Sequence, residues 1–323
     1  MAPRYCILVD AMTVLITGGS GFVGSVLVDK LLAKGRRVIS ISRHSPTPRE
    51  NFVPLAGDIT KPNLGLNSGA LADAAGGKID AIYHLAAVHT LGNDKNGLIQ
   101  KTNVDGTRNV IDFCIRHDVP HLLFCSTAYT SGENPYERSK IANEREISSF
   151  AKFNGVKATI FKPSVIMGKE DHPYPGHFSQ FISLVVRIHR RAELIRRNIE
   201  GTLRLPVIEP VFRIKGNPQG KLNLVTVDAV AEAMANIDKE GTFWLTNPEP
   251  PTLGQLVEWA GEFIKVRMRI EPEFKPTLIE AQFMKIASAF APYLQGDDFP
   301  SDLESCPITR EFIHETITRT LGD

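Results

Sequence analysis

A tyrosine and a lysine stand four positions apart in the segment NPYERSK, as Tyr136 and Lys140. On a helix this spacing puts both side chains on one face, about 6 Å apart. A free phenol has a pKa near 10, but a neighbouring ammonium favours the phenolate and lowers that pKa. The pair therefore predicts a proton-transfer group, Tyr136, whose acidity is adjusted by Lys140. Taken alone, the same spacing also fits an exposed pair on a helix surface.

A glycine-rich segment, VLITGGSGFVGS, is the second chemical feature. It places Gly18, Gly21 and Gly24 at intervals of three, directly after an apolar run. If a strand ends at Thr17 and a helix begins near Phe22, the loop lies at the carboxyl edge of a sheet, where unpaired helix N–H groups bind anions. Gly18 permits the tight turn, Gly21 lets a pyrophosphate approach the backbone, and Gly24 lets the helix pack on the strand. The segment predicts a dinucleotide site.

Hydrophobic periodicity defines the elements that must position these groups. Strand-like and helix-like segments alternate through the first half of the chain. Strands separated by helical crossovers predict an α/β fold, a doubly wound parallel sheet of the Rossmann type with helices on both faces. The expected strands are 13–17, 37–41, 51–58, 81–87, 121–127 and 157–163, and the expected helices are 23–34, 103–117 and 139–154.

The second half of the chain is less regular. Beyond Gly168 the sequence is rich in Pro, His and basic residues, and the tail from Thr252 is mainly helical in pattern. We expect a Rossmann domain over 1–168 and a smaller, mixed and mainly helical substrate-binding region over 169–323. Within the latter, 221–246 is expected to return to the Rossmann sheet.

Composition excludes several classes of protein. The 37 Lys and Arg nearly cancel the 36 Asp and Glu, so no global field attracts nucleic acid or an anionic membrane. No apolar run approaches the roughly 18 residues of a membrane span. The cysteines follow no metal-ligand spacing and predict reduced thiols in a cytoplasmic protein without a metal site; they are Cys6, Cys114, Cys125 and Cys306. Residues 1–11 are either an upstream extension or a frayed first strand.

Six segments, taken in order, resemble the extended short-chain dehydrogenase/reductase family, which includes NAD-dependent epimerases and dehydratases. They are TGGSGFVG (17–24), GDIT (57–60), YHLAA (83–87), NVDGTRNV (103–110), YERSK (136–140) and KPSVIMG (162–168). The resemblance implies hydride transfer with a nicotinamide ring, Tyr136 being the acid in reduction and the base in oxidation. It gives Thr127, or Ser126 as its rival, a hydrogen bond to the substrate oxygen. Asn103 would help to hold Lys140, and it also fits a helix N-cap.

The same resemblance implies which residues bind the cofactor. An NAD enzyme of this fold usually ends its second strand with an acid, but here the strand leads to Arg43, a cation suited to a 2′-phosphate. We therefore expect NADP, with NAD as the alternative, since an Arg at this place also fits a solvated charge. The expected cofactor-binding residues are Gly18, Ser20, Gly21, Phe22, Val23, Gly24, Arg43, Asp58, Ile59, Leu85, Ala86, Ala87, Lys140, Pro163 and Val165.

The substrate is suggested by a further resemblance, to thioester reductases and fatty acyl reductases. Its segments are STAY (126–129), YERSKIANE (136–144), KPSVIMG (162–168), LNLVTVDAVAEAM (222–234) and FWLTNPEPPTLGQLVEW (243–259). It implies reduction of an aldehyde, ketone or acyl thioester, the acyl group being carried on CoA or an acyl carrier protein. The basic run 187–197 would bind the carrier's phosphates or form a solvated helix face.

Two other functions fit the same scaffold. One is a nucleotide-sugar epimerase, and the other is a non-catalytic NADP-binding sensor or scaffold. The resemblance also allows a homodimer that pairs through the helices expected at 103–117 and 139–154.

Overall fold

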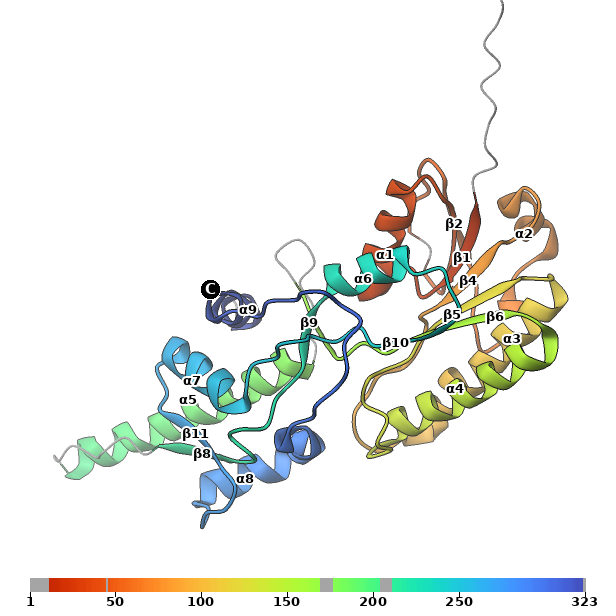
Figure 1. Cartoon of the computed structure of the whole chain (residues 1–323). Coiled ribbons are helices and arrows are strands. Elements are labelled where there is room, and N and C mark those ends of the chain that lie inside the picture. The colour runs from red at the N-terminus through yellow and green to blue at the C-terminus, as the bar shows by residue number, and fades with distance from the viewer. Residues whose placement is uncertain (1–11, 45, 169–176, 204–210, 322–323) are drawn as a thin grey trace, which may run out of the picture. The chain divides into compact units, whose positions relative to one another are not determined.

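The computed structural model describes residues 12–44, 46–168, 177–203 and 211–321, arranged in two compact units (Figure 1). The first unit runs to Pro163 and takes in Asp228–Phe243, and the second holds Ser164–Val227 and Trp244–Asp323. These bounds differ from the sequence-based division at residue 168 with its return over 221–246. The predictions for residues 1–11 and for Cys6 lie outside the described residues.

A seven-stranded parallel sheet forms the centre of the first unit. Its strand order is β10-β6-β5-β4-β1-β2-β3, with the order reversing outward from β1 and β4. This arrangement confirms the doubly wound Rossmann sheet, because each crossover returns the chain to a parallel neighbour. The strands are β1 (Thr13–Thr17), β2 (Arg37–Ser42), β3 (Phe52–Ala56), β4 (Ala81–His84), β5 (His121–Cys125), β6 (Lys157–Phe161) and β10 (Gly241–Phe243).

Helices cover both faces of this sheet. Figure 1 shows α1 and α6 together on one face and α3 and α4 together on the other. An ion pair of 2.9 Å between Lys30 and Glu232 joins α1 to α6. The helices are α1 (Phe22–Ala33), α2 (Ser68–Ala75), α3 (Gly106–Arg116), α4 (Pro135–Asn154) and α6 (Val227–Asn236).

Two helix starts differ from the sequence-based prediction. The helix expected from residue 139 begins at Pro135, because Asn134 caps it by accepting a 2.9 Å hydrogen bond from the Glu137 amide. The helix expected from residue 103 begins as a π-helical turn, Gln100–Asp105, which continues into α3. Asn103 therefore lies inside this turn, and the N-cap interpretation of Asn103 is wrong.

Four strands end earlier than predicted, at Ala56, His84, Cys125 and Phe161. After Cys125 the chain leaves the sheet ladder, and the Ser126 amide donates to the Phe161 carbonyl oxygen at 2.8 Å. The motif residues that follow these strands therefore stand on loops at the carboxyl edge of the sheet, where side chains can reach a ligand.

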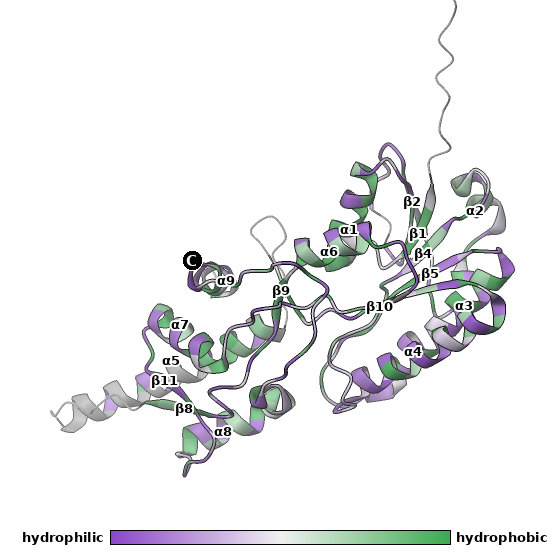
Figure 2. Cartoon of the chain, in the orientation of Figure 1, coloured by the Kyte–Doolittle hydropathy of each residue, from purple (hydrophilic) through white to green (hydrophobic). Residues whose placement is uncertain are grey.

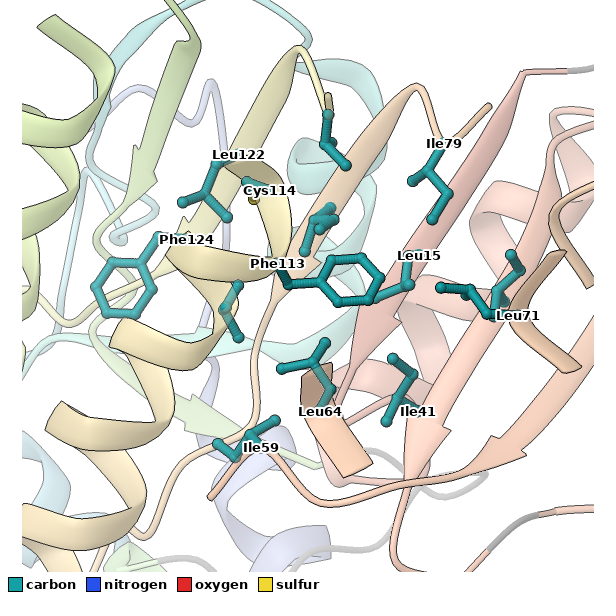
Figure 3. Close-up of a cluster of buried hydrophobic side chains, with 14 of the residues drawn as sticks. Leu15, Ile41, Ile59, Leu64, Leu71, Ile79, Phe113, Cys114, Leu122 and Phe124 are labelled. Carbon is teal, nitrogen blue, oxygen red and sulfur yellow. The ribbon is translucent and has the colours of Figure 1, made fainter. Parts of the chain in front are cut away.

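Apolar side chains from the sheet and from α3 form the core of the first unit. Figure 3 shows Phe113 of α3 lying against Leu15 of β1, with Leu122 and Phe124 of β5 in the same cluster. All four are at most 1% exposed. Figure 2 shows that α4 alternates hydrophilic and hydrophobic residues, as expected of a helix with one face on this core.

The second unit combines two short parallel strand pairs with helices. The pairs are β7 with β9 and β8 with β11. The sequence did not predict β8, and β11 was not expected in the mainly helical tail from Thr252. The basic run 187–197 lies within α5. The elements are β7 (Val165–Met167), α5 (His177–Leu203), β8 (Phe212–Lys215), β9 (Leu224–Thr226), α7 (Leu253–Ile264), β11 (Met268–Glu271), α8 (Leu278–Ile286), the 3₁₀-helical segment Ser288–Gln295 and α9 (Arg310–Leu321).

Two further features that the sequence analysis considered are membrane-spanning segments and the state of the cysteines. Within the described ranges, no helix is both long and apolar enough to cross a bilayer. Cys114, Cys125 and Cys306 are free thiols, and Cys114 and Cys306 are buried.

Candidate active site

Tyr136 and Lys140 lie together on α4, beside the end of β5. The Lys140 side chain is buried, with its Nζ donating a 2.6 Å hydrogen bond to the Cys125 carbonyl oxygen. The same Nζ is 5.7 Å from the centre of the Tyr136 ring and 4.7 Å from that of Phe124. Burial lowers the pKa of Lys140. The structure thus sets a desolvated ammonium next to a half-buried phenol.

Asn103 fixes the start of α4 through its side-chain amide. Its Oδ1 accepts from the Val88 amide at 2.8 Å, and its Nδ2 donates to the Val88 carbonyl at 2.9 Å and to Ser139 Oγ at 3.0 Å. Ser139 Oγ in turn donates to the Tyr136 carbonyl oxygen at 2.6 Å. Because Asn103 and Ser139 are both buried, these bonds hold the backbone that carries Tyr136.

The two rival hydroxyls after β5 have different partners. Ser126 Oγ donates to the carboxylate of Glu144. Thr127 Oγ1 accepts from the Tyr129 amide at 3.2 Å, which leaves its hydrogen able to donate. This geometry favours Thr127 over Ser126 as a donor to a substrate oxygen.

The glycine loop makes a close turn against the end of β4. Gly18 has a φ of +78°, and a Cβ on it would lie 2.8 Å from the Ala86 nitrogen. A Cβ on Gly24 would lie 2.1 Å from the Gly18 carbonyl oxygen. The turn is closed by a 2.9 Å hydrogen bond from the Gly21 amide to the same oxygen. Side chains at Gly18 and Gly24 are therefore excluded.

The N-terminus of α1 faces this loop without a compensating charge. Among the described residues, no side chain caps it at Gly21, and its first turn contains no acid. Ser20 and Gly21 are exposed, and Phe22 and Val23 are half-buried. The positive end of the helix dipole is thus available to an anion.

Arg43 and Asp58 follow the neighbouring strands β2 and β3. Arg43 is exposed. Asp58 Oδ1 accepts from the amide and the hydroxyl of Thr60, both at 2.9 Å. The pKa of Asp58 is lowered chiefly by the Thr60 amide, with smaller effects of the Lys61 and Arg43 charges. The residue after Asp58, Ile59, packs against Gly106 of α3.

A family model described as the NAD dependent epimerase/dehydratase family matches residues 14–234, more than half of the chain. The match includes the glycine loop, Tyr136 and Lys140. The chain belongs to this family.

Relatives within the family differ in what their names say they do. A Drosophila melanogaster protein named as a fatty acyl-CoA reductase is 23% identical over 232 residues, covering 50% of this chain and 42% of that protein. UDP-glucose 4-epimerase 4 of Oryza sativa subsp. japonica is 29% identical over 221 residues, covering 56% of this chain and 58% of that protein. The chain thus spans about half the length of these curated relatives.

A solved structure shows the shared fold. The terminal R domain from the myxalamid PKS-NRPS biosynthetic pathway superposes with a TM-score of 0.66 at 20% identity, covering 96% of this chain and 90% of that one.

The family implies a nicotinamide dinucleotide, and the residues present fit one. Gly18 lets the loop turn directly against the Ala86 backbone, where a Cβ would collide, and the exposed Gly21 has no side chain to keep an anion from the backbone at the start of α1. The uncapped start of α1 provides N–H groups for a pyrophosphate.

Most of the residues expected at the cofactor site lie at one edge of the first unit. The glycine loop, 18–24, lies next to Leu85–Ala87, because Gly18 packs against the backbone of Ala86. The Pro163 carbonyl oxygen accepts a 2.8 Å hydrogen bond from the Ala128 amide, in the loop after β5. Val165 is the exception, because it begins β7 in the second unit. In the described part of the chain, no group of three His, Cys, Asp or Glu could hold a metal ion.

The sequence analysis did not identify several polar residues that surround Tyr136, Lys140 and the glycine loop. They stand inside segments quoted for other reasons, YHLAA, NVDGTRNV and YERSKIANE. Helical spacing was the available signal, because Thr107 follows Asn103 by four and Glu144 follows Lys140 by four. The missed residues are Thr17, His84, Thr107, Ser139, Asn143, Glu144 and Lys162.

Proposed function

We propose that the protein is an NAD(P)H-dependent oxidoreductase that reduces the carbonyl of an aldehyde, a ketone or an acyl thioester. The observation that carries the proposal is the buried Lys140, whose Nζ lies 5.7 Å from the centre of the Tyr136 ring. A buried ammonium is unfavourable for stability unless it is well partnered. Its position beside a phenol is explained by proton transfer.

The proposed cofactor site consists of the glycine loop and its neighbours. Gly18 and Gly21 admit the pyrophosphate to the start of α1, and Leu85–Ala87 form a wall beside it. Asp58 and Ile59 are proposed to contact the adenine end. A bound nicotinamide would supply the hydride.

Tyr136 is the proposed proton donor. As a carbonyl carbon gains a hydride, negative charge develops on its oxygen, and the Tyr136 hydroxyl transfers its proton there. The Lys140 ammonium stabilises the phenolate that remains. Thr127 is proposed to donate a hydrogen bond to the same oxygen, and Asn103, through Ser139, keeps Tyr136 in place.

We propose NADP as the preferred cofactor. Arg43 is exposed at the end of β2, where the chain has no acid to bind a ribose 2′-hydroxyl. A guanidinium there would bind a 2′-phosphate through charge-assisted hydrogen bonds.

An acyl substrate is supported by the fatty acyl-CoA reductase name of one relative. A nucleotide-sugar epimerase is the second candidate, supported by the rice relative, and it would use the same Tyr136 and Lys140. A non-catalytic sensor is less well supported, because the pair of residues needed for proton transfer is intact.

The test is NADPH oxidation, followed by absorbance, with a panel of aldehydes, acyl-CoA thioesters and UDP-sugars. Tyr136→Phe removes the proton donor and is expected to lower turnover by about 10²- to 10⁴-fold while NADPH still binds. Tyr83→Phe is the matched control, because the buried Tyr83 hydroxyl bonds only weakly to the Met234 carbonyl, at 3.4 Å.

Equal turnover of Tyr136→Phe and the wild type would overturn the mechanism. Interconversion of UDP-sugars without net NADPH oxidation would favour the epimerase instead.

A further inference from the structure

A line of buried polar side chains joins the glycine loop to α4. Thr17 Oγ1 lies 2.7 Å from His84 Nδ1, and His84 Nε2 lies 3.0 Å from Thr107 Oγ1. Thr107 Oγ1 donates to the Asn103 carbonyl oxygen at 2.6 Å, and Asn143 Nδ2 donates to the same oxygen at 2.9 Å. All five residues are at most 1% exposed, so bulk water does not reach them.

The direction of these hydrogen bonds is fixed from one end. The Asn103 carbonyl can only accept, so the Thr107 hydroxyl donates to it and must accept from His84 Nε2–H. His84 Nδ1 then carries no hydrogen and accepts from the Thr17 hydroxyl. Thr17 Oγ1 finally accepts from the Ala86 amide at 3.3 Å.

His84 is neutral in this arrangement. Burial, with a smaller effect of the Lys140 charge, lowers its pKa to about 3. A neutral imidazole has one donor and one acceptor nitrogen, and the two threonines require the Nε2–H tautomer.

The two ends of the line belong to different parts of the proposed site. Thr17 precedes Gly18, and Ala86 lies where a Cβ on Gly18 would collide. At the other end, Asn103 bonds Ser139, which holds the Tyr136 carbonyl. The line therefore runs from the proposed cofactor loop to the backbone of the proposed proton donor.

We propose that His84 is a positioning residue that couples the cofactor loop to the Asn103–Tyr136 side of the site through a single tautomer. The proposal rests on the proposed function of the site. If Thr107 lost its hydroxyl, His84 Nε2–H would lose its acceptor, and the Nδ1–H tautomer would become favourable. Thr17 Oγ1 would then accept from the Nδ1–H as well as from the Ala86 amide, and its own hydrogen would lose His84 as its acceptor, which disturbs the contact with Ala86 beside Gly18.

Thr107→Val tests the coupling. Valine keeps the shape of threonine, and the hydrogen-bond partners of Thr107 described above, His84 and Asn103, are not residues of the glycine loop. Thr159→Val is the matched control. Thr159 is also fully buried, accepts from His121 Nε2 at 2.7 Å and donates to the Lys239 carbonyl at 2.7 Å. His121 begins β5, at the sheet edge opposite to the glycine loop, and Thr159 lies on the neighbouring strand β6.

Calorimetric titration with NADPH is the first measurement. Thr107→Val is expected to weaken NADPH by about five- to tenfold, and Thr159→Val to leave it within about twofold. Equal affinities of the two variants and the wild type would overturn the coupling. If the wild type itself bound neither NADPH nor NADH, the proposed function and the coupling that rests on it would both be wrong.

The tautomer gives a readout independent of cofactor and activity. In ¹⁵N-histidine-labelled protein, long-range proton–nitrogen NMR is expected to show His84 as Nε2–H, with its signals identified by their loss in His84→Gln. Thr107→Val is expected to shift them toward the Nδ1–H form. An Nδ1–H tautomer in the wild type, or no change in Thr107→Val, would contradict the proposed direction of the line.

Discussion

Two buried lysines next to the candidate site are stabilised in different ways. Lys162 is paired with the Glu144 carboxylate at 3.2 Å, and its side chain is 8% exposed. Lys140 makes no ion pair with any described residue, and its ammonium instead faces the Cys125 carbonyl and the rings beside it. An ammonium without a carboxylate keeps its electrostatic effect for the group next to it, Tyr136. This difference supports the proposed chemical role of Lys140, while the ion pair gives Lys162 a structural role.

The rival hydroxyls after β5 can be separated by substitution. Thr127→Val keeps the side-chain shape and removes the hydrogen that Thr127 can donate, so we expect turnover to fall by about 10²-fold. Ser126→Ala removes a bond to Glu144, which keeps Lys162 as a partner, so we expect a smaller loss. Steady-state kinetics with one substrate decide between them, and Thr127→Ser is expected to restore most activity. A larger loss in Ser126→Ala would give Ser126 the role.

Cofactor choice depends on Arg43. The 2′-phosphate of NADPH carries nearly two negative charges, and a guanidinium binds it with charge-assisted hydrogen bonds. We expect Arg43→Ala to weaken NADPH by about ten- to a hundredfold and to leave NADH nearly unchanged. Titration of both cofactors by calorimetry measures this, with Arg49→Ala, an exposed arginine paired with Asp29, as control.

Equal losses for both cofactors would mean that Arg43 supports the loop in general. No loss for either cofactor would place the phosphate elsewhere or make NAD the cofactor.

At the scale of elements, the parallel sheet could be predicted because its strands are buried on both faces. Thr13–Thr17 is wholly buried and its bounds match the prediction, since a run of apolar and β-branched residues is a strong signal. Strand ends were less predictable. YHLAA continues the apolar run, but only Ala81–His84 pairs in the sheet, because the residues beyond His84 turn toward the glycine loop.

The polar interior could not be predicted in the same way. Asn103 lies in a π-helical turn, which the apolar period of an ordinary helix does not reveal. The bond from Thr17 to His84 joins residues 67 positions apart, so the local sequence gives no indication of it. The sequence analysis did not predict β8 and β11, because their sequences, FRIK and MRIE respectively, are only four residues long and contain charged residues.

At the scale of the whole molecule, the outer surface of α3 and α4 is the surface at which we expect two copies to pair. A hollow of about 370 Å³ lies between these helices. Two exposed apolar residues lie one helical turn beyond residues that line the hollow. Ile115 of α3 follows Ile111 and is 52% exposed, and Phe153 of α4 follows Ser149 and is 83% exposed. The residues that line the hollow are Arg108, Ile111, Asp112, Arg145, Glu146, Ser149 and Phe150.

We predict that this surface pairs with the same surface of a second copy. A symmetric dimer brings each residue of the surface into the contact twice, so one substitution removes two copies of its side chain. Burying a Phe contributes about 2 kcal/mol, so Phe153→Glu should cost about 4 kcal/mol and weaken dimerisation about a thousandfold. Light scattering after size-exclusion chromatography should show a dimer for the wild type and a monomer for Phe153→Glu. Leu278→Glu, on the 91% exposed Leu278 of α8, is the matched control and should remain a dimer. A monomeric wild type at high micromolar concentration, or a dimer that persists in Phe153→Glu, would exclude this surface as the interface.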